Sequence, residues 1–258
     1  PVTVETTETQ TFSVSEPLPE GDTPVQLTIG MGAGSLDLRG GAEGLVEGEV
    51  RYNVPGWEPE ISRQDNELSI TQKTGLSGAL PSGNPVNKWE LKLGNYPIDL
   101  HVNAGAYDGT LDLSAIPLVN LEISDGASNA QVKFNVPNPA SMQKLEYKTG
   151  ASSVKLVGLA NANFSEMRFS SGAGSYTLDF SGTLQQSAKV DITSGVSEVT
   201  IIVPKGVKTT VDLGGELTDV NTRGTWTASD RLYQTDGEGP ELNIQVNMGL
   251  GSLNLEQE

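Results

Sequence analysis

The chain has 258 residues, no cysteine and a formal net charge of −17, from 33 acidic and 16 basic residues. The lack of cysteine excludes disulfides, thiol catalysis and cysteine-ligated metal sites, and the acidic surplus without a basic stripe argues against nucleic-acid binding and against direct attachment to an anionic membrane surface. Aromatic residues make up only 5% of the chain while glycines number 30, which suits a narrow core with many tight corners.

The opening segment, residues 1–20, is rich in Thr and Glu and predicts a flexible, solvated linker or stalk. It begins at Pro1 without a Met, and we expect that an N-terminal anchor or signal has been removed. The sequence contains no run that predicts a membrane span, so we expect no direct insertion of this segment into a membrane.

Residues 21–96 predict an N-terminal β subdomain. It opens with a strand-turn-strand unit at residues 27–38, centred on Gly32 and Ala33. Less regular strand candidates follow at residues 49–53, 67–72 and 89–93. Residues 74–87 are rich in Gly, Pro and Ser, and we expect them to form a mobile loop whose role the sequence does not define.

The centre of the chain repeats the same strand-turn-strand unit at intervals of 21 to 24 residues, with glycines at Gly105, Gly126, Gly150, Gly172 and Gly195. A period of this length is typical of stacked repeats. A further copy lies at residues 244–255, and residues 211–213 look like an eighth, degenerate copy.

Apolar residues fall into fixed columns when the units are aligned on this glycine. The column three residues before it holds Val102, Ile123, Tyr147, Phe169 and Ile192. The apolar positions lie at odd distances before the glycine and at even distances after it. Because side chains alternate between the two faces of a strand, the chain must turn at the glycine to keep both sets buried. Glycine suits this position because it tolerates unusual backbone angles. One unit cannot bury its apolar face alone, but stacked units can. We therefore predict an all-β fold in which residues 97–258 form a β-solenoid, a single-stranded β-helix-like stack of coils with irregular β caps.

A solenoid leaves an open strand edge at each end, which promotes aggregation unless it is covered. We expect residues 43–96 and a capping excursion at residues 221–240 to provide this cover. Trp57, Trp89 and Trp226 all lie in these irregular segments. We interpret them as plugs for the ends of the stack rather than as an exposed aromatic binding site.

The most prominent polar feature is an outward column four residues before the glycine, comprising His101, Glu122, Glu146, Arg168 and Asp191. If coils stack about 4.8 Å apart, the two glutamates repel each other unless Arg168, a protonated His101 or a bound cation offsets them. We favour a solvated charge ladder with some ion pairing, because a calcium site needs more oxygen ligands than this column supplies. We predict no catalytic, cofactor-binding or metal-binding residue and no cofactor.

Two stretches are similar to a known bacterial family. Residues 27–55, with the run from Gly32 to Leu38, and residues 87–113 resemble the N-terminal part of the toast-rack proteins. The following coils resemble the associated putative adhesin β-solenoid, so that the resemblance covers residues 22–255. It implies a cell-envelope protein displayed outside the cytoplasm, related to domains of cell-wall-active antibiotic response proteins, and it offers no catalytic residues.

The leading functional hypothesis is a non-enzymatic extracytoplasmic adhesin or envelope scaffold, at the cell surface or anchored to a membrane. Its expected partner is an unidentified cell-envelope protein or glycan. The alternative is a sensory or regulatory module of a cell-envelope stress response that acts through a membrane partner. A third and weaker hypothesis is a polysaccharide-cleaving β-helix enzyme, which would need outward acids such as Asp112 and Asp179 paired across a groove.

Overall fold

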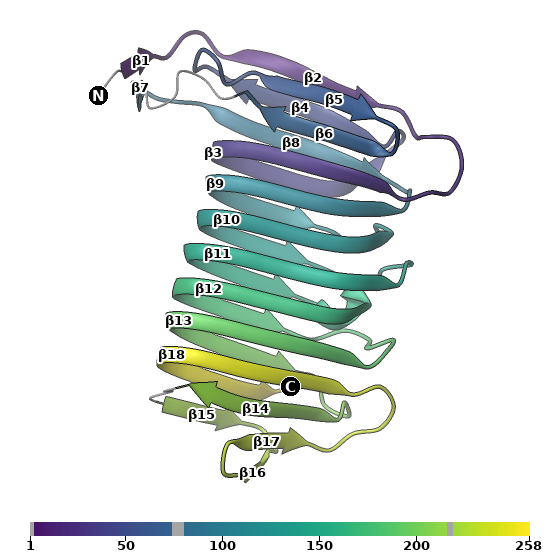
Figure 1. The fold of residues 1–258 in the computed structure, drawn as a ribbon, viewed down its shortest axis with the longest axis vertical. Helices are drawn as coiled ribbons and strands as arrows, with labels where there is room; N and C mark the ends of the chain where they lie inside the picture. The colour runs from purple at the N-terminus through teal and green to yellow at the C-terminus, as the bar shows by residue number, and fades with distance from the viewer. Residues whose placement is uncertain (1–2, 74–79, 216–218) are drawn as a thin grey trace.

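The protein is a flattened β-solenoid, seen here in a computed structural model that describes residues 3–73, 80–215 and 219–258 (Figure 1). Seven long strands form its body, and each contributes one rung to a stack of parallel rungs. In stacking order they are β3 (Val25–Ala42), β9 (Ile98–Asp112), β10 (Leu118–Lys133), β11 (Met142–Val157), β12 (Phe164–Asp179), β13 (Ala188–Val203) and β18 (Leu242–Gln257). The predicted all-β solenoid is confirmed.

Each rung is one continuous strand that folds back on itself at its glycine, so that its two halves lie in separate layers (Figure 1). The pairing keeps the columns in register: Ile123 pairs with Val102 on one side and with Tyr147 on the other. Tyr147 in turn pairs with Phe169, and their rings lie 5.8 Å apart. The apolar columns of both halves therefore meet between the layers in one continuous core.

The corner is tight because glycines stack directly on glycines. A Cβ placed on Gly150 would lie 2.3 Å from the carbonyl oxygen of Gly126 in the preceding rung, and equivalent approaches of 2.5 to 2.9 Å recur at the other corners from Gly105 to Gly249. A side chain at this position would push the rungs apart. Close backbone approach is thus the main reason why the repeat requires glycine.

The side opposite the corners is closed by loops and by a buried 3-10 helix, η1 (Leu159–Ala162). Buried asparagines connect these loops from rung to rung. Asn138 donates to the carbonyl oxygens of Leu118 and Ala162, at 2.8 and 3.1 Å, and Asn161 donates to that of Phe134 at 2.8 Å. Such bonds satisfy backbone groups that the irregular loops would otherwise leave unpaired.

The N-terminal end of the stack is covered by a β cap, to which the predicted segment, residues 43–96, contributes most of the strands. Two strands of the cap extend the stack by pairing in parallel with the two halves of β3: β6 (Glu67–Gln72) and β8 (Asn87–Gly94). Outside them lie β2 (Gln10–Glu16), β4 (Val46–Tyr52) and β5 (Pro59–Gln64). Trp89 is fully buried there and Trp57 is half-buried, which fits the expected plugging role best for Trp89.

The expectation that residues 1–20 form a linker is wrong for much of that segment. Residues 10–16 form β2, which pairs with β4 along its whole length, and Val14 is buried in the common core. β1 (Thr3–Glu5) pairs in parallel with β7 (Leu80–Ser82).

Of the loop expected at residues 74–87, positions 74–79 lie outside the described residues, and β7 occupies positions 80–82. The subdomain division after residue 96 stays a prediction, although one core runs across it.

At the C-terminal end, the rungs do not stack in chain order. β14 (Thr209–Gly215) and β15 (Asp219–Arg223) form the degenerate eighth rung, but both pair with β18 rather than with β13. β18 is the last strand in the sequence, and it lies between β13 and β14. The hairpin of β16 (Thr227–Ser229) and β17 (Leu232–Thr235) then covers β14. The predicted capping excursion, residues 221–240, therefore lies beyond β18 at the C-terminal end of the stack (Figure 1).

Candidate functional site

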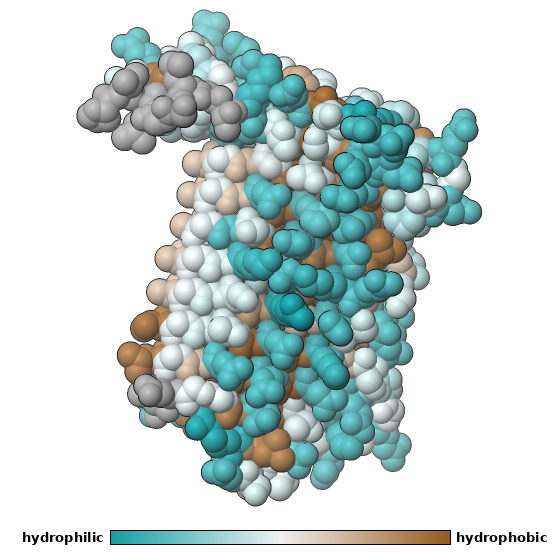
Figure 2. Space-filling model, viewed as in Figure 1, coloured by the Kyte–Doolittle hydropathy of each residue, from teal (hydrophilic) through white to brown (hydrophobic). Residues whose placement is uncertain are grey.

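The predicted outward column lies on the half of each rung that precedes the corner. His101 pairs with Glu122, Glu122 with Glu146, Glu146 with Arg168 and Arg168 with Asp191, so the column is continuous across five rungs. Figure 2 shows hydrophilic residues gathered over the middle of the stacked rungs on the face toward the viewer. The column is not uniformly exposed, because Glu146 is only 6% accessible.

Lysines, rather than Arg168 or His101 alone, offset the repulsion between the two glutamates. Lys148 Nζ lies 3.5 Å from Glu122 Oε1 and 3.3 Å from Glu146 Oε2, and Lys144 Nζ lies 2.5 Å from the same Glu146 oxygen. Burial opposes ionisation of Glu146, but the hydrogen bonds from Lys144 and Lys148 outweigh it and lower its pKa. His101 contributes contacts of 3.0 Å to Asp99 and 3.8 Å to Glu122. The column is a charge network of mixed sign.

The opposite half of the rungs carries a shallow polar groove, lined mainly by amide and hydroxyl groups with one acidic and one basic residue. Its volume is about 480 Å³, and it crosses β9, β10 and β11. Six outward side chains line it: Asp108, Thr110, Asn129, Gln131, Ser153 and Lys155. Register pairs such as Asn129 with Ser153 and Gln131 with Lys155 place these groups in rows. Amide and hydroxyl groups in rows offer both donors and acceptors to an extended polar ligand.

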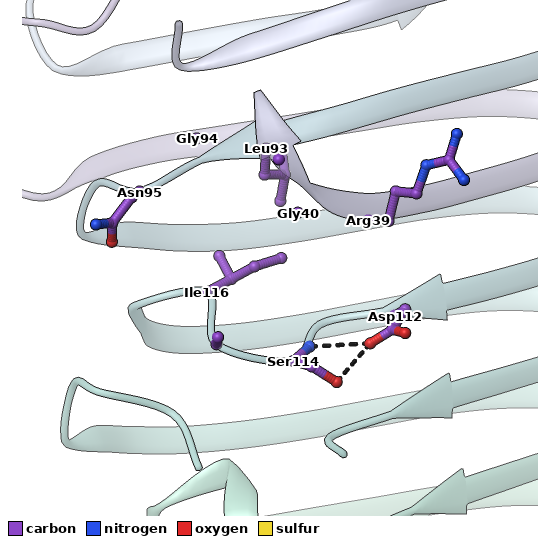
Figure 3. Close-up of a pocket in the computed structure, with 10 residues that line it drawn as sticks. Arg39, Gly40, Leu93, Gly94, Asn95, Asp112, Ser114 and Ile116 are labelled. Carbon is purple, nitrogen blue, oxygen red and sulfur yellow. Dashed lines mark hydrogen bonds between the residues drawn. The ribbon is translucent and has the colours of Figure 1, made fainter. Parts of the chain in front are cut away.

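A second hollow of about 400 Å³ lies where the cap meets the solenoid (Figure 3). Ile116 lies beneath it, and the guanidinium group of Arg39 points away from it. Asp112 does not face the hollow as a free acid, because it accepts hydrogen bonds from the backbone nitrogen of Ser114 at 3.2 Å and from its hydroxyl at 2.5 Å. This hollow brings together no set of groups suited to acid–base chemistry.

The acids considered for polysaccharide cleavage are not paired. Asp112 ends β9 and Asp179 ends β12, and two further rungs separate these strands. At about 4.8 Å per rung they lie roughly 14 Å apart, beyond the separation at which two carboxylates cleave a glycosidic bond. Asp179 accepts a hydrogen bond from the backbone nitrogen of Ser181, as Asp112 does from Ser114. Both acids stabilise turns at strand ends.

The corner edge carries a continuous row of exposed apolar residues, one after each corner glycine: Ala33, Ala106, Ala127, Ala151, Ala173, Val196 and Leu250. Figure 2 shows the edge as a pale strip that becomes more hydrophobic toward the C-terminal rungs. Val196 and Leu250 are 61% and 53% exposed.

Sequence reasoning missed a polar cluster inside the corner, centred on Asp125. This side chain is 8% exposed and accepts hydrogen bonds from Tyr147 Oη at 2.8 Å, Thr149 Oγ1 at 2.5 Å and Ser152 Oγ at 3.3 Å. The sequence pattern does indicate that these positions face inward. Asp125 and Thr149 lie one residue before Gly126 and Gly150, and odd distances before the glycine are the buried ones. A second hydroxyl cluster, of Ser171, Ser194 and Ser197, continues the polar lining into β12 and β13.

The family described as the N-terminal domain of toast_rack (DUF2154) matches residues 3–157 and, in a second match, residues 136–202. The chain belongs to the toast-rack family. Two overlapping matches are expected of a repetitive solenoid, because one profile aligns with more than one set of rungs. Comparison with curated protein sequences finds no match to this toast-rack protein.

Several solved structures are similar to this toast-rack protein, among them the following two. A putative cell adhesion protein from Clostridium sporogenes ATCC 15579 is 22% identical, with a TM-score of 0.52 over 97% of this chain and 99% of the other. A putative adhesin from Bacteroides fragilis NCTC 9343 is 12% identical, with a TM-score of 0.40 over 98% and 99% of the two chains. The first likeness shows a shared fold, and from the second we draw nothing further. Among the described residues of the chain, no helix is long and apolar enough to cross a membrane.

Proposed function

We propose that this toast-rack protein is a non-enzymatic, extracytoplasmic scaffold that binds an extended cell-envelope glycan or protein through its solenoid. The repeated, in-register polar rows of the groove over β9–β11 are the observation that carries the proposal. Shared interfaces between rungs hold these rows in a fixed geometry, so a partner meets a preorganised surface. The name of the similar Clostridium sporogenes protein supports the same role.

The shape of the candidate surface favours binding over catalysis. The groove is shallow and polar, whereas sites for small substrates are enclosed and mostly apolar. Rows of hydroxyl and amide groups suit a ligand that repeats along its length, such as a polysaccharide or an extended peptide. Localisation at the cell surface or through a membrane anchor is part of this proposal. A regulatory role through a membrane partner is the alternative, and it predicts the same fold but a different contact surface.

The proposal is tested by measuring binding of the purified protein to a panel of purified bacterial cell-wall glycans and envelope proteins. The double variant Asn129→Ala/Gln131→Ala should weaken binding to any partner found, because it removes two neighbouring amides from the groove. Ser170→Ala/Thr193→Ala is the matched control, since both side chains are exposed on the other half of the rungs. Retention of no envelope component, or equal weakening by both variants, would contradict the proposal.

A further inference from the structure

The interior cluster at Asp125 contains a negative charge without a basic partner. None of the ion pairs formed within the described part of the chain includes Asp125. Its three side-chain donors are the hydroxyls of Tyr147, Thr149 and Ser152. Hydroxyl dipoles stabilise a carboxylate but do not neutralise it, and a buried charge without a counter-charge is costly.

Two buried oxygens near this cluster make no regular hydrogen bond to any described residue of the chain. They are Tyr107 Oη and Ser128 Oγ, which belong to register-paired residues on β9 and β10. Tyr107 is only 5% exposed, and its hydroxyl lies near that of Tyr147 and in the field of Asp125. Ser128 is joined to the cluster through its backbone nitrogen, which donates to Ser152 Oγ at 2.8 Å. Unpaired buried polar atoms of this kind are rare and call for a partner such as a bound water or ion.

The position of Tyr107 is a built feature of the fold. A Cβ on Gly109 would lie 2.5 Å from the Tyr107 ring, so the glycine makes room for the ring inside the corner. β12 has the two residues in the reverse order, with Gly174 beside the hydroxyl of Tyr176. There the tyrosine hydroxyl donates to the carbonyl oxygen of Ala173 at 2.8 Å. Within the described residues, the Tyr107 hydroxyl makes no such bond to a carbonyl, and its polar neighbour is the hydroxyl of Tyr147.

The cluster is also accessible. A surface hollow of about 390 Å³ lies over the corner, and both Tyr107 and Ser128 line it. Its rim includes alanines and glycines, so small side chains separate solvent from the cluster at this point.

We propose that the corner between β9, β10 and β11 binds one monovalent metal cation, Na⁺ in the first instance, through Asp125 and the hydroxyls of Tyr107 and Ser128. The donor set consists of oxygen atoms only, which selects hard cations over zinc and copper. A single carboxylate balances a single positive charge. Calcium, which takes six to eight oxygen ligands and is usually held by several carboxylates, fits this cluster less well.

Thermal unfolding of the full chain in NaCl and in choline chloride of equal ionic strength tests the proposal. A bound ion raises the midpoint by mass action, and we expect Tm to be higher by about 3 to 6 °C in NaCl when Na⁺ is tenfold above its dissociation constant. Asp125→Asn and Ser128→Ala should each abolish the difference between the salts. Asp191→Asn, an exposed Asp-to-Asn change on the outward column, should leave it intact.

Should Asp125→Asn fail to fold, Ser128→Ala and ²³Na NMR of the unaltered protein decide the question. A bound, exchanging ion broadens the ²³Na signal, and Ser128→Ala should narrow it again. Equal Tm values in both salts together with an unbroadened ²³Na signal would overturn the proposal and assign the two orphaned hydroxyls to a trapped water only. Loss of the salt difference in Asp191→Asn would overturn it as well.

Discussion

Tyr147 illustrates how single residues combine two tasks in this narrow core. Its ring packs against Phe169 in the column predicted from sequence, and its hydroxyl donates to Asp125. Burial raises the pKa of Tyr147 well above its usual range, and burial also raises that of Tyr107 to about 12. Both hydroxyls therefore stay protonated at any physiological pH, and Tyr147 remains a donor.

Tyr147→Phe should destabilise the fold by about 1.5–3 kcal/mol, the usual range for a hydrogen bond to a charged group. The ring remains, so the change isolates the hydroxyl. Tyr176→Phe is the matched control, because it removes a bond to a neutral carbonyl and should cost only about 0.5–1.5 kcal/mol. Urea denaturation measures the free energy of unfolding of both variants. Equal losses would show that the bond to Asp125 stabilises the fold no more than a bond to a neutral carbonyl.

Glu146 gives a pH-dependent contribution with a defined sign. Its pKa in the folded protein lies below the ordinary value of 4.5 because Lys144 and Lys148 outweigh the effect of burial. The stabilisation is therefore fully present above pH 4.5 and is lost as the pH falls through the lowered folded pKa. Glu146→Gln should reduce stability at pH 7, and the difference from the unaltered protein should shrink as the pH falls below 4.5. A difference that stays constant with pH would contradict this account.

At the scale of the element, the corner glycine sets the spacing of the rungs. Gly150→Ala would place a Cβ 2.3 Å from the Gly126 carbonyl oxygen, whereas at Gly126 the same change leaves 2.9 Å to that of Gly105. Both alanines should destabilise, within the common range of about 0.5–3 kcal/mol, and Gly150→Ala should cost clearly more. Thermal denaturation of the two variants makes the comparison. An equal or reversed order would mean that spacing between rungs does not select glycine here.

Sequence reasoning was most successful for these repeating elements. The columns through Ile123, Tyr147 and Phe169 are buried and in register because side-chain parity and glycine spacing are local properties. It failed for β2, although Phe12 and Val14 alternate with polar residues as a strand does, because Thr and Glu dominate the surrounding composition. It also missed the Asp125 cluster: the alternation points Asp125 and Thr149 inward, but their hydrogen-bond partners depend on the register between rungs.

The order of stacking could not be predicted from the repeats at all. Every rung offers similar columns and a similar edge, so periodicity does not reveal that β18 lies between β13 and β14. Only the three-dimensional pairing distinguishes that arrangement from stacking in chain order. The groove over β9–β11 shares this limitation, because its rows arise from register between strands that are more than 20 residues apart.

At the scale of the whole molecule, negative charge is concentrated at the two ends. Residues 1–96 hold 14 acidic and 6 basic residues, residues 97–203 hold 10 and 6, and residues 204–258 hold 9 and 4. The terminal regions thus carry −8 and −5 of the net charge of −17, and the central rungs carry the remaining −4. Like-charged ends oppose end-to-end pairing of strand edges, the usual liability of an open solenoid.

This distribution predicts salt-dependent association. The protein should remain monodisperse at about 0.01 M ionic strength and associate more at about 1 M, where the screening length falls from about 30 to about 3 Å. Light scattering over that range measures the effect. Replacing acids of the N-terminal cap with amides, for example Glu60→Gln and Glu67→Gln, should shift association to lower salt. Stronger association at low salt than at high salt would contradict the role assigned to the charged ends.

The last strand, β18, lies between β13 and the strands β14 and β15. β14 and β15 are therefore attached to the stack only through their pairing with β18. The chain has no cysteine of its own, so introduced pairs report stacking order directly. Thr200 pairs with Asn254, and Asn254 pairs with Asn221 on the far side of β18. Adjacent rungs lie within disulfide reach, while rungs two apart do not.

Oxidative cross-linking of paired cysteine variants is therefore the most direct test of the architecture. Thr200→Cys/Asn254→Cys should form an intramolecular disulfide readily, and Thr200→Cys/Asn221→Cys should not. Cross-linking of the second pair in preference to the first would mean that the rungs stack in chain order, and would contradict the structure described for the C-terminal end.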